Sequence, residues 1–239
     1  MSESTLIAST AKLTRLQLAA VPTPLGTVTH RPVPHAEVVE ALVETLSFRH
    51  ISVVTEEYAV SKDGMKMFGV LDLDTGMPGC RFSIGVRNSH DRSMRLAAVA
   101  GVRVTVCENM AFSGDFQPVL AKHSKHFSLQ NALSIGVDQM QRNFEPMRRQ
   151  VEEWRARQIS TVAAKLIIYQ AFVESDLDAP KHLARQVHDL YFQPTHPEFE
   201  PRTLWSLTNA FTSAFKELEP IPQFKATAKL AGFLQAVRT

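Results

Sequence analysis

The hydrophobic pattern of this chain changes period once along its length, and that change limits the folds it can adopt. Between residues 80 and 87 apolar side chains alternate with polar ones, and residues 96–107 alternate again. A period of two places successive side chains on opposite faces of a β-strand, so both segments are predicted to be strands. From Phe127 onward the spacing becomes helical. Strands followed by helices predict an α+β protein.

The first half of the chain predicts an antiparallel meander of about four strands joined by short turns. Asp63-Gly64 is a strong signal for one tight turn. A helix is expected over residues 35–48, with Pro34 in its first turn and an apolar face packed on the meander. The four strands are predicted at residues 51–60, 65–74, 80–87 and 96–107.

The second half predicts helices. Seven apolar residues are spaced alternately four and three apart, which predicts a long helix packed along a partner. Pro146 predicts a kink there or two abutting helices. The partner is either another part of the chain or a second copy, and Met140, Phe144, Met147 and Trp154 are the side chains expected at such a homo-oligomer surface. The seven residues are Leu133, Val137, Met140, Phe144, Met147, Val151 and Trp154. Further helices are predicted at residues 162–173, 180–192, 203–218 and 224–237.

The expected domain organisation has two parts. Residues 1–34 contain four prolines and are predicted to be an extended N-terminal arm, because each proline removes a backbone donor and fixes φ. Residues 35–239 are predicted to form a single α+β domain, with a β-rich part at 35–115 and a helical part at 127–239.

Composition points to a cytoplasmic protein. The formal net charge is only +2, no apolar stretch reaches the ~18 residues that a membrane span needs, and two cysteines give no disulfide framework. No signal peptide is expected, because the first residues lack a basic start followed by an apolar run. We therefore expect no membrane partner.

The small net charge hides a local imbalance. Five arginines stand against the single Asp91 between residues 81 and 103, whereas residues 51–80 are acidic. If one strand face is exposed, Arg81, Arg87 and Arg103 form a basic stripe able to bind the phosphates of DNA or RNA. The alternative is that these arginines pair with the acidic strand beside them. The candidate nucleic-acid-binding residues are Arg81, Arg87, Arg92, Arg95 and Arg103.

The turn at residues 88–93 is rich in small polar residues, which favour turns because their side chains bond nearby backbone. A functional interpretation takes His90 and Asp91 as an acid/base or ligand pair, with Cys107 as a nucleophile if a histidine lies close. Cys107 is otherwise a buried strand residue.

No bound metal or cofactor is expected. Two histidines three apart at residues 122–126 lie among lysines that would repel a cation. The sequence contains no glycine-rich phosphate loop and no serine-nucleophile elbow.

Two stretches resemble the phage- and plasmid-associated proteins that carry domain of unknown function 932. One is the turn followed by a strand that ends in Cys-x-Asn, and the other is a Trp-x-x-x-Asn-Ala-x-Thr helix. The resemblance covers residues 35–217, and the chain departs from it at Arg92, where glycine is common. It implies a protein encoded on a mobile element, where handling DNA is a common task, but no mechanism. The motif residues are Asn88, Ser89, His90, Asp91, Cys107, Asn109, Trp205 and Asn209.

Three functions remain open from the sequence. The first is a nucleic-acid-binding protein without catalytic activity, and the second is a protein-interaction or regulatory oligomer that uses the helical half. The third is a hydrolytic or metal-dependent enzyme that uses the turn at residues 88–91. The absence of catalytic motifs favours the first two.

Overall fold

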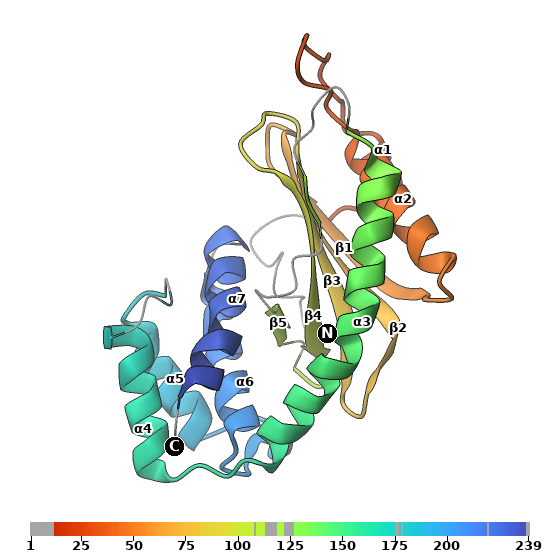
Figure 1. The fold of residues 1–239 in the computed structure, drawn as a ribbon. Coiled ribbons are helices and arrows are strands. Elements are labelled where there is room, and N and C mark those ends of the chain that lie inside the picture. The colour runs from red at the N-terminus through yellow and green to blue at the C-terminus, as the bar shows by residue number, and fades with distance from the viewer. Residues whose placement is uncertain are drawn as a thin grey trace. The chain divides into compact units, whose positions relative to one another are not determined.

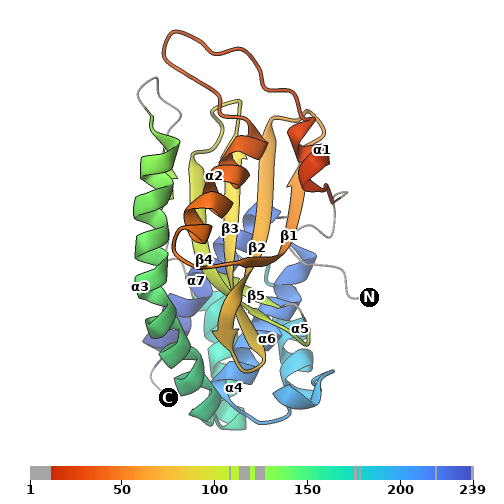
Figure 2. The same ribbon diagram turned by 90° about the vertical axis from the view of Figure 1, so that its right-hand side faces the viewer.

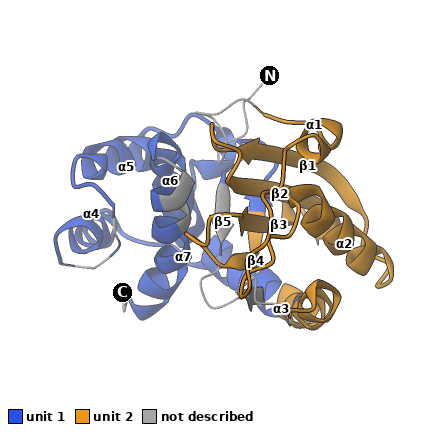
Figure 3. Cartoon of the chain, turned by 90° about the horizontal axis from the view of Figure 1, so that it is seen from above, with its two compact units in different colours: residues 1–6, 103–115, 145–239 blue, residues 7–102, 116–144 orange. Residues whose placement is uncertain are grey.

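A computed structural model describes residues 12–107, 109–112, 119–121, 127–174, 177, 179–218 and 220–237. The chain divides into two compact units, and each is built from segments that are distant in sequence (Figure 3). Unit 2 comprises residues 7–102 and 116–144, and unit 1 comprises residues 1–6, 103–115 and 145–239. The α+β class is confirmed, with an antiparallel sheet followed by a helical C-terminal half.

The sheet of unit 2 has the predicted meander order, β1-β2-β3-β4 (Figure 2). In β2 and β3 the register is long, from Lys66 opposite Ser89 to Met77 opposite Cys80. A short strand, β6, pairs with the start of β4. The strands are β1 (Val53–Val60), β2 (Lys66–Met77), β3 (Cys80–Ser89), β4 (Leu96–Val104) and β6 (Val119–Ala121).

The turns of the meander place two loops at the same end of the sheet. The predicted Asp63-Gly64 turn joins β1 to β2, and Gly64 has a φ of 72°, which glycine adopts without strain. Because neighbouring strands are antiparallel, the loop between β3 and β4 returns to that end, while the β2–β3 hairpin at Pro78-Gly79 lies at the opposite end. The predicted turn at residues 75–79 was too long, since β2 continues to Met77 through an irregularity after Asp72.

Two helices cover one face of the sheet (Figure 2). Helix α2 (His35–Ser47) has the predicted position, and its apolar residues Val38, Val39 and Leu42 are completely buried. Pro34 is the N-cap residue rather than a first-turn residue. The first part of α3 (Leu129–Ala156) packs here as well, and the rings of Phe82 in β3 and Phe144 in α3 stack 4.4 Å apart.

The N-terminal arm is not extended throughout, because a short helix, α1 (Arg15–Ala19), forms within it. Thr14 accepts a hydrogen bond from the backbone of Gln17, whose side chain accepts one from Thr14 in return, so this capping box starts the helix before the first proline of the arm. Leu13 pairs with Tyr58 of β1 as an isolated bridge. The arm therefore adds an edge contact to the sheet.

Unit 1 is mainly helical. Helix α6 (Leu204–Ala214) is its buried centre, where every residue except Ser213 is buried. A helix that is buried on all sides lies in the interior of its unit, and the other helices of unit 1 surround it in the chain order. The other elements are β5 (Met110–Phe112), α4 (Thr161–Tyr169), the π-helical turn η1 (Gln170–Glu174), α5 (Leu183–Phe192), the 3₁₀ turns η2 (Pro197–Phe199) and η3 (Phe215–Glu217), and α7 (Pro220–Ala236).

Helix α3 (Leu129–Ala156) is one helix that runs through Pro146, so the alternative of two abutting helices is wrong (Figure 1). The heptad seam along it is buried within the single chain, and all seven side chains are at most 9% exposed. Met140, Phe144, Met147 and Trp154, the residues predicted for a homo-oligomer surface, are therefore buried within the chain. Among the described helices, including this long one, none is sufficiently long and apolar to cross a membrane.

Candidate functional site

The polar motif at the end of β3 holds the arm against the sheet. The side chains of Asn88 and His90 are 0% and 3% exposed. Both donate to the backbone carbonyl of Val33, from Asn88 Nδ2 at 2.9 Å and from His90 Nε2 at 3.0 Å. A carbonyl oxygen has two lone pairs and can accept both bonds. The arm segment just before α2 is thereby fixed to the end of the sheet.

Hydrogen bonds also determine the protonation of three histidine rings at this end. A carbonyl only accepts, so Nε2 of His90 carries a proton, and so does Nε2 of His35, which lies 3.0 Å from the carbonyl of Gly64. His35 Nδ1 then accepts from Asn88 Nδ2 at 2.9 Å. His30 Nε2 donates to the carbonyl of His90 at 3.1 Å. Each ring is thus used to tie backbone segments together.

The rings of His35 and His90 stack, with centroids 3.8 Å apart and planes 5° apart. Burial lowers the pKa of His90; the hydrogen bond to Val33 and the charge of Asp91 oppose that effect, and His30 adds to it, leaving the pKa below its ordinary value of 6.5. A catalytic histidine is oriented by a carboxylate on its second nitrogen. Among the described residues, Nδ1 of His90 has no hydrogen-bond partner. His90 therefore has the geometry of a structural residue.

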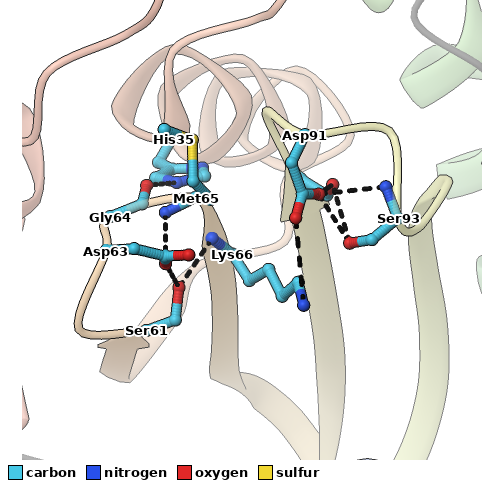
Figure 4. A network of polar contacts seen from close by, with 9 residues as sticks. His35, Ser61, Asp63, Gly64, Met65, Lys66, Asp91 and Ser93 are labelled. Atoms are coloured by element: carbon cyan, nitrogen blue, oxygen red, sulfur yellow. Dashed lines mark hydrogen bonds and ion pairs between the residues drawn. The ribbon is translucent and has the colours of Figure 1, made fainter.

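Asp91 is held by the turn in which it lies (Figure 4). Its carboxylate accepts from the hydroxyls of Ser89 and Ser93, each at 2.5 Å, and from the backbone N–H of Ser93 at 2.9 Å. Lys66 Nζ lies 3.8 Å away. Burial acts to raise the pKa of Asp91, but these hydrogen bonds and the lysine outweigh it and lower the pKa to about 2. Asp91 is a charged acceptor that closes the β3–β4 turn.

The β1–β2 turn has a similar carboxylate (Figure 4). Asp63 accepts from Ser61 Oγ at 2.5 Å and from the N–H of Met65 at 3.0 Å, and these bonds lower its pKa. The N–H of His90 donates to the carbonyl of Met65 at 2.8 Å, which joins the two turns. The ends of all four strands are thus connected at this edge.

The structure does not bring the candidate catalytic residues His90, Asp91 and Cys107 into mutual hydrogen bonds. His90 is bonded to backbone and Asp91 to serines, so the two neighbours do not act as a pair. Cys107 lies in unit 1, is 7% exposed, and its carbonyl accepts from Lys216 Nζ at 2.6 Å. Within the described part of the chain, no group of three His, Cys, Asp or Glu side chains could hold a metal ion. The histidines at residues 122–126 lie outside the described residues.

The second motif forms a polar cluster inside unit 1. Asn109 Nδ2 donates to the backbone carbonyl of Asn209 at 3.1 Å, with the side-chain oxygen of Asn209 at 3.3 Å. Asn209 Nδ2 in turn donates to the carbonyl of Trp205 at 2.9 Å, and Thr212 Oγ1 bonds the Asn209 carbonyl at 3.2 Å. The guanidinium of Arg155 lies 5.3 Å from the centre of the Trp205 ring. Two motifs about a hundred residues apart therefore meet and fasten α6 to the segment after β4.

The sequence model of one protein family, Domain of unknown function (DUF932), matches residues 24–231. The chain belongs to this family. No curated protein and no solved structure gives a significant match. Both polar clusters of this DUF932 protein lie within the matched residues.

The five arginines predicted to bind nucleic acid do not form one stripe in this DUF932 protein. Arg103 is only 6% exposed, because the strand alternation that suggested an open face does not hold: every residue of β4 is buried. Arg81 is exposed but lies at the β2–β3 hairpin, the far end of the sheet. Arg87 is half-buried, and burial lowers its pKa. Arg92 and Arg95 are exposed in the β3–β4 loop.

The acidic residues of the first two strands have partners of their own. Glu56 pairs with Arg15 and Glu57 with Lys12, both from the arm. Asp72 accepts from Ser83 Oγ at 2.6 Å. The sequence indicated an acidic strand, but it did not show that the arm lies beside β1 and pairs with two of its carboxylates.

Several cations that sequence reasoning did not select gather where the turns meet. Arg31 precedes the Val33 anchor, Lys62 belongs to the β1–β2 turn, and Lys66 is the first residue of β2; this turn is bonded to the β3–β4 loop. The signal that could have found them was the antiparallel meander itself, which places alternate turns at one edge. We call this surface the basic end, and it consists of Arg31, Lys62, Lys66, Arg87, Arg92 and Arg95.

Proposed function

We propose that the basic end of unit 2 binds the phosphate backbone of a nucleic acid and that the protein catalyses no reaction on it. The supporting observation is the state of the charges at this edge. Asp63 and Asp91, the acidic residues of its two turns, are held by hydroxyl and backbone donors, with lowered pKa values. Lys62, Arg92 and Arg95 are exposed beside them. Exposed cations on a rigid edge suit a polyanion.

The absence of catalysis in this proposal rests on how the motif is used. Asn88 and His90, two buried motif residues at this edge, both donate a hydrogen bond to the Val33 carbonyl. A general base must reach the proton it removes, whereas the His90 ring is covered on one side by His35. The motif acts as a scaffold for a binding edge.

Fluorescence anisotropy with labelled oligonucleotides tests the proposal at several salt concentrations. Replacement of Arg92 or Arg95 by alanine is expected to weaken binding severalfold, and each is expected to reduce the slope of log K against log[salt] by about 0.7–0.9, one phosphate contact. Arg81→Ala is the matched control, because Arg81 is an exposed arginine at the opposite end of the same sheet. Equal losses in all three variants, or no binding by the wild type at low salt, would refute the proposal.

The resemblance that the family match supports gives the proposal a setting. A phosphate-binding protein of this kind would work in the cytoplasm on the DNA or RNA of a phage or plasmid. That setting is part of the proposal.

A second candidate function is self-association through the helical half, and one observation favours it. Val162, Leu166, Tyr169 and Val173 are 50–77% exposed along α4 and η1. Their spacing of four, three and four is the same in both directions, so an antiparallel second copy would place each side chain opposite another of the stripe. Analytical ultracentrifugation of the wild type and of Leu166→Glu tests it: a dimer that the variant abolishes supports this function, and a monomer at 100 µM or so excludes it as a standard-sized interface.

A further inference from the structure

The arm loop, residues 21–34, carries two apolar side chains that nothing covers in the described structure. Leu25 is 95% exposed and Val28 is 88% exposed. The loop leaves the sheet at the edge where the basic end lies (Figure 2). Single exposed apolar residues are common on protein surfaces, but two at one loop tip beside a cluster of cations form a mixed surface.

The tip of the arm loop has a defined shape. The N–H of Thr27 donates to the carbonyl of His30 at 2.8 Å, and the N–H of His30 donates to Thr27 Oγ1 at 3.2 Å, which closes a four-residue turn with Val28 at its tip. Gly26 lies against the returning chain, where an added Cβ would be 3.0 Å from the His30 carbonyl and 3.8 Å from Cα of Arg31. Leu25 and Val28 are therefore presented by a folded turn.

The same contacts place this turn in the basic end. His30 Nε2 donates to the carbonyl of His90, so the motif holds the base of the loop. Arg92 Nη2 donates to Thr27 Oγ1 at 2.6 Å, so one of the exposed arginines reaches the tip. Arg31 lies in the segment that follows the turn, next to Gly26. The two apolar side chains are thus flanked by Arg31 and Arg92.

We propose that the arm loop contacts unpaired bases, so that the protein prefers single-stranded nucleic acid; this inference rests on the proposed function of the basic end. A duplex shows a protein its charged backbone and the edges of its bases, while the base faces are stacked inside. Aliphatic side chains gain little against phosphates, whereas they pack on the exposed faces of unpaired bases. The flanking arginines then track the backbone on either side of those bases.

The experiment compares a single-stranded oligonucleotide with its duplex at near-physiological salt. The wild type is expected to bind the single strand about tenfold more tightly, a gain that needs only part of the apolar surface of Leu25 and Val28 to be buried against bases. The double variant Leu25→Ser/Val28→Ser is expected to lose that preference while its salt slope stays the same, because no phosphate contact is removed. Phe48→Ser is the matched control, since Phe48 is 76% exposed at the C-terminal end of α2 and is an apolar residue outside the loop. It should keep the preference.

Each outcome separates this inference from the proposed function. Equal affinity for single strand and duplex, or a preference that survives the double variant, overturns the role of the arm loop while salt-dependent binding would still support the basic end. Binding to neither form overturns both. Vesicles that contain about 30% phosphatidylserine are the last probe. If Leu25 and Val28 are required for binding to these vesicles but not for binding to oligonucleotides, the arm loop contacts a membrane surface and the inference is refuted.

Discussion

Arg92 stands in the left-handed region of backbone space, with φ of 65°, and this makes a sharp test of the β3–β4 loop. In that region the Cβ atom crowds the following carbonyl, at a cost of roughly 1–2 kcal/mol for a residue other than glycine. Glycine avoids the crowding but has a more flexible unfolded chain, which offsets about 0.5–1 kcal/mol. Arg92→Gly is therefore expected to be more stable than Arg92→Ala by about 0.5–1 kcal/mol.

The comparison of these two variants isolates the backbone, because both lose the side-chain hydrogen bond to Thr27 and the same positive charge. Urea unfolding should be followed by far-UV circular dichroism, since the only two tryptophans, Trp154 and Trp205, both lie in unit 1 and would not report on unit 2. If alanine proves as stable as glycine, Arg92 does not hold a left-handed conformation in solution. Both variants should lose the same nucleic-acid affinity, because only their backbones differ.

Three further predictions concern stability. Burial holds the pKa of His90 below its unfolded value of 6.5, so the unfolded chain binds more protons and stability should fall as the pH decreases below 6.5. The slope should reach up to about 1.4 kcal/mol per pH unit, and His90→Gln should reduce it. Denaturant titrations between pH 5 and 8 measure the slope, and a slope that His90→Gln leaves unchanged would contradict the burial of a neutral ring against His35. Asn209→Ala should destabilise unit 1 by about 0.5–1.5 kcal/mol, because it removes the bond from Asn209 Nδ2 to the Trp205 carbonyl while Asn109 keeps the backbone carbonyl of residue 209; tryptophan fluorescence during urea unfolding follows that loss. Phe82→Ala should lower the free energy of unfolding by about 3–5 kcal/mol, as expected for a fully buried ring. A loss below about 1 kcal/mol would mean that the Phe82 ring is exposed to solvent.

Local pattern predicted most of the elements of this fold. Period-two alternation and the Asp63-Gly64 turn identified the meander, and the heptad spacing identified α3, because those signals come from neighbouring residues. Helix α1 was missed because the prolines after it suggested an extended arm, although the Thr14 and Gln17 pair was a readable capping box. The heptad seam could not reveal whether its partner lay in the same chain.

The candidate site was harder to predict, since its contacts join segments that only the fold brings together. Asn88 and His90 were selected by the motif, but their acceptor is Val33, 55 and 57 residues away. Arg103 was selected by strand alternation, which fails where both faces of a strand are covered, as in β4. Sequence can identify polar residues of this kind, whereas their roles follow from which backbone groups they reach.

The fastening of Asn109 to Asn209 has a consequence for how the chain is made. The bond spans 100 residues, and the bond from Lys216 to the carbonyl of Cys107 spans 109. A ribosome adding about 5–20 residues per second needs several seconds or more to synthesise the intervening chain. During that time the segment after β4 has no α6 to bind, while nearly all partners within the β1–β4 meander have already been made. Unit 1 is therefore the later of the two units to complete during synthesis.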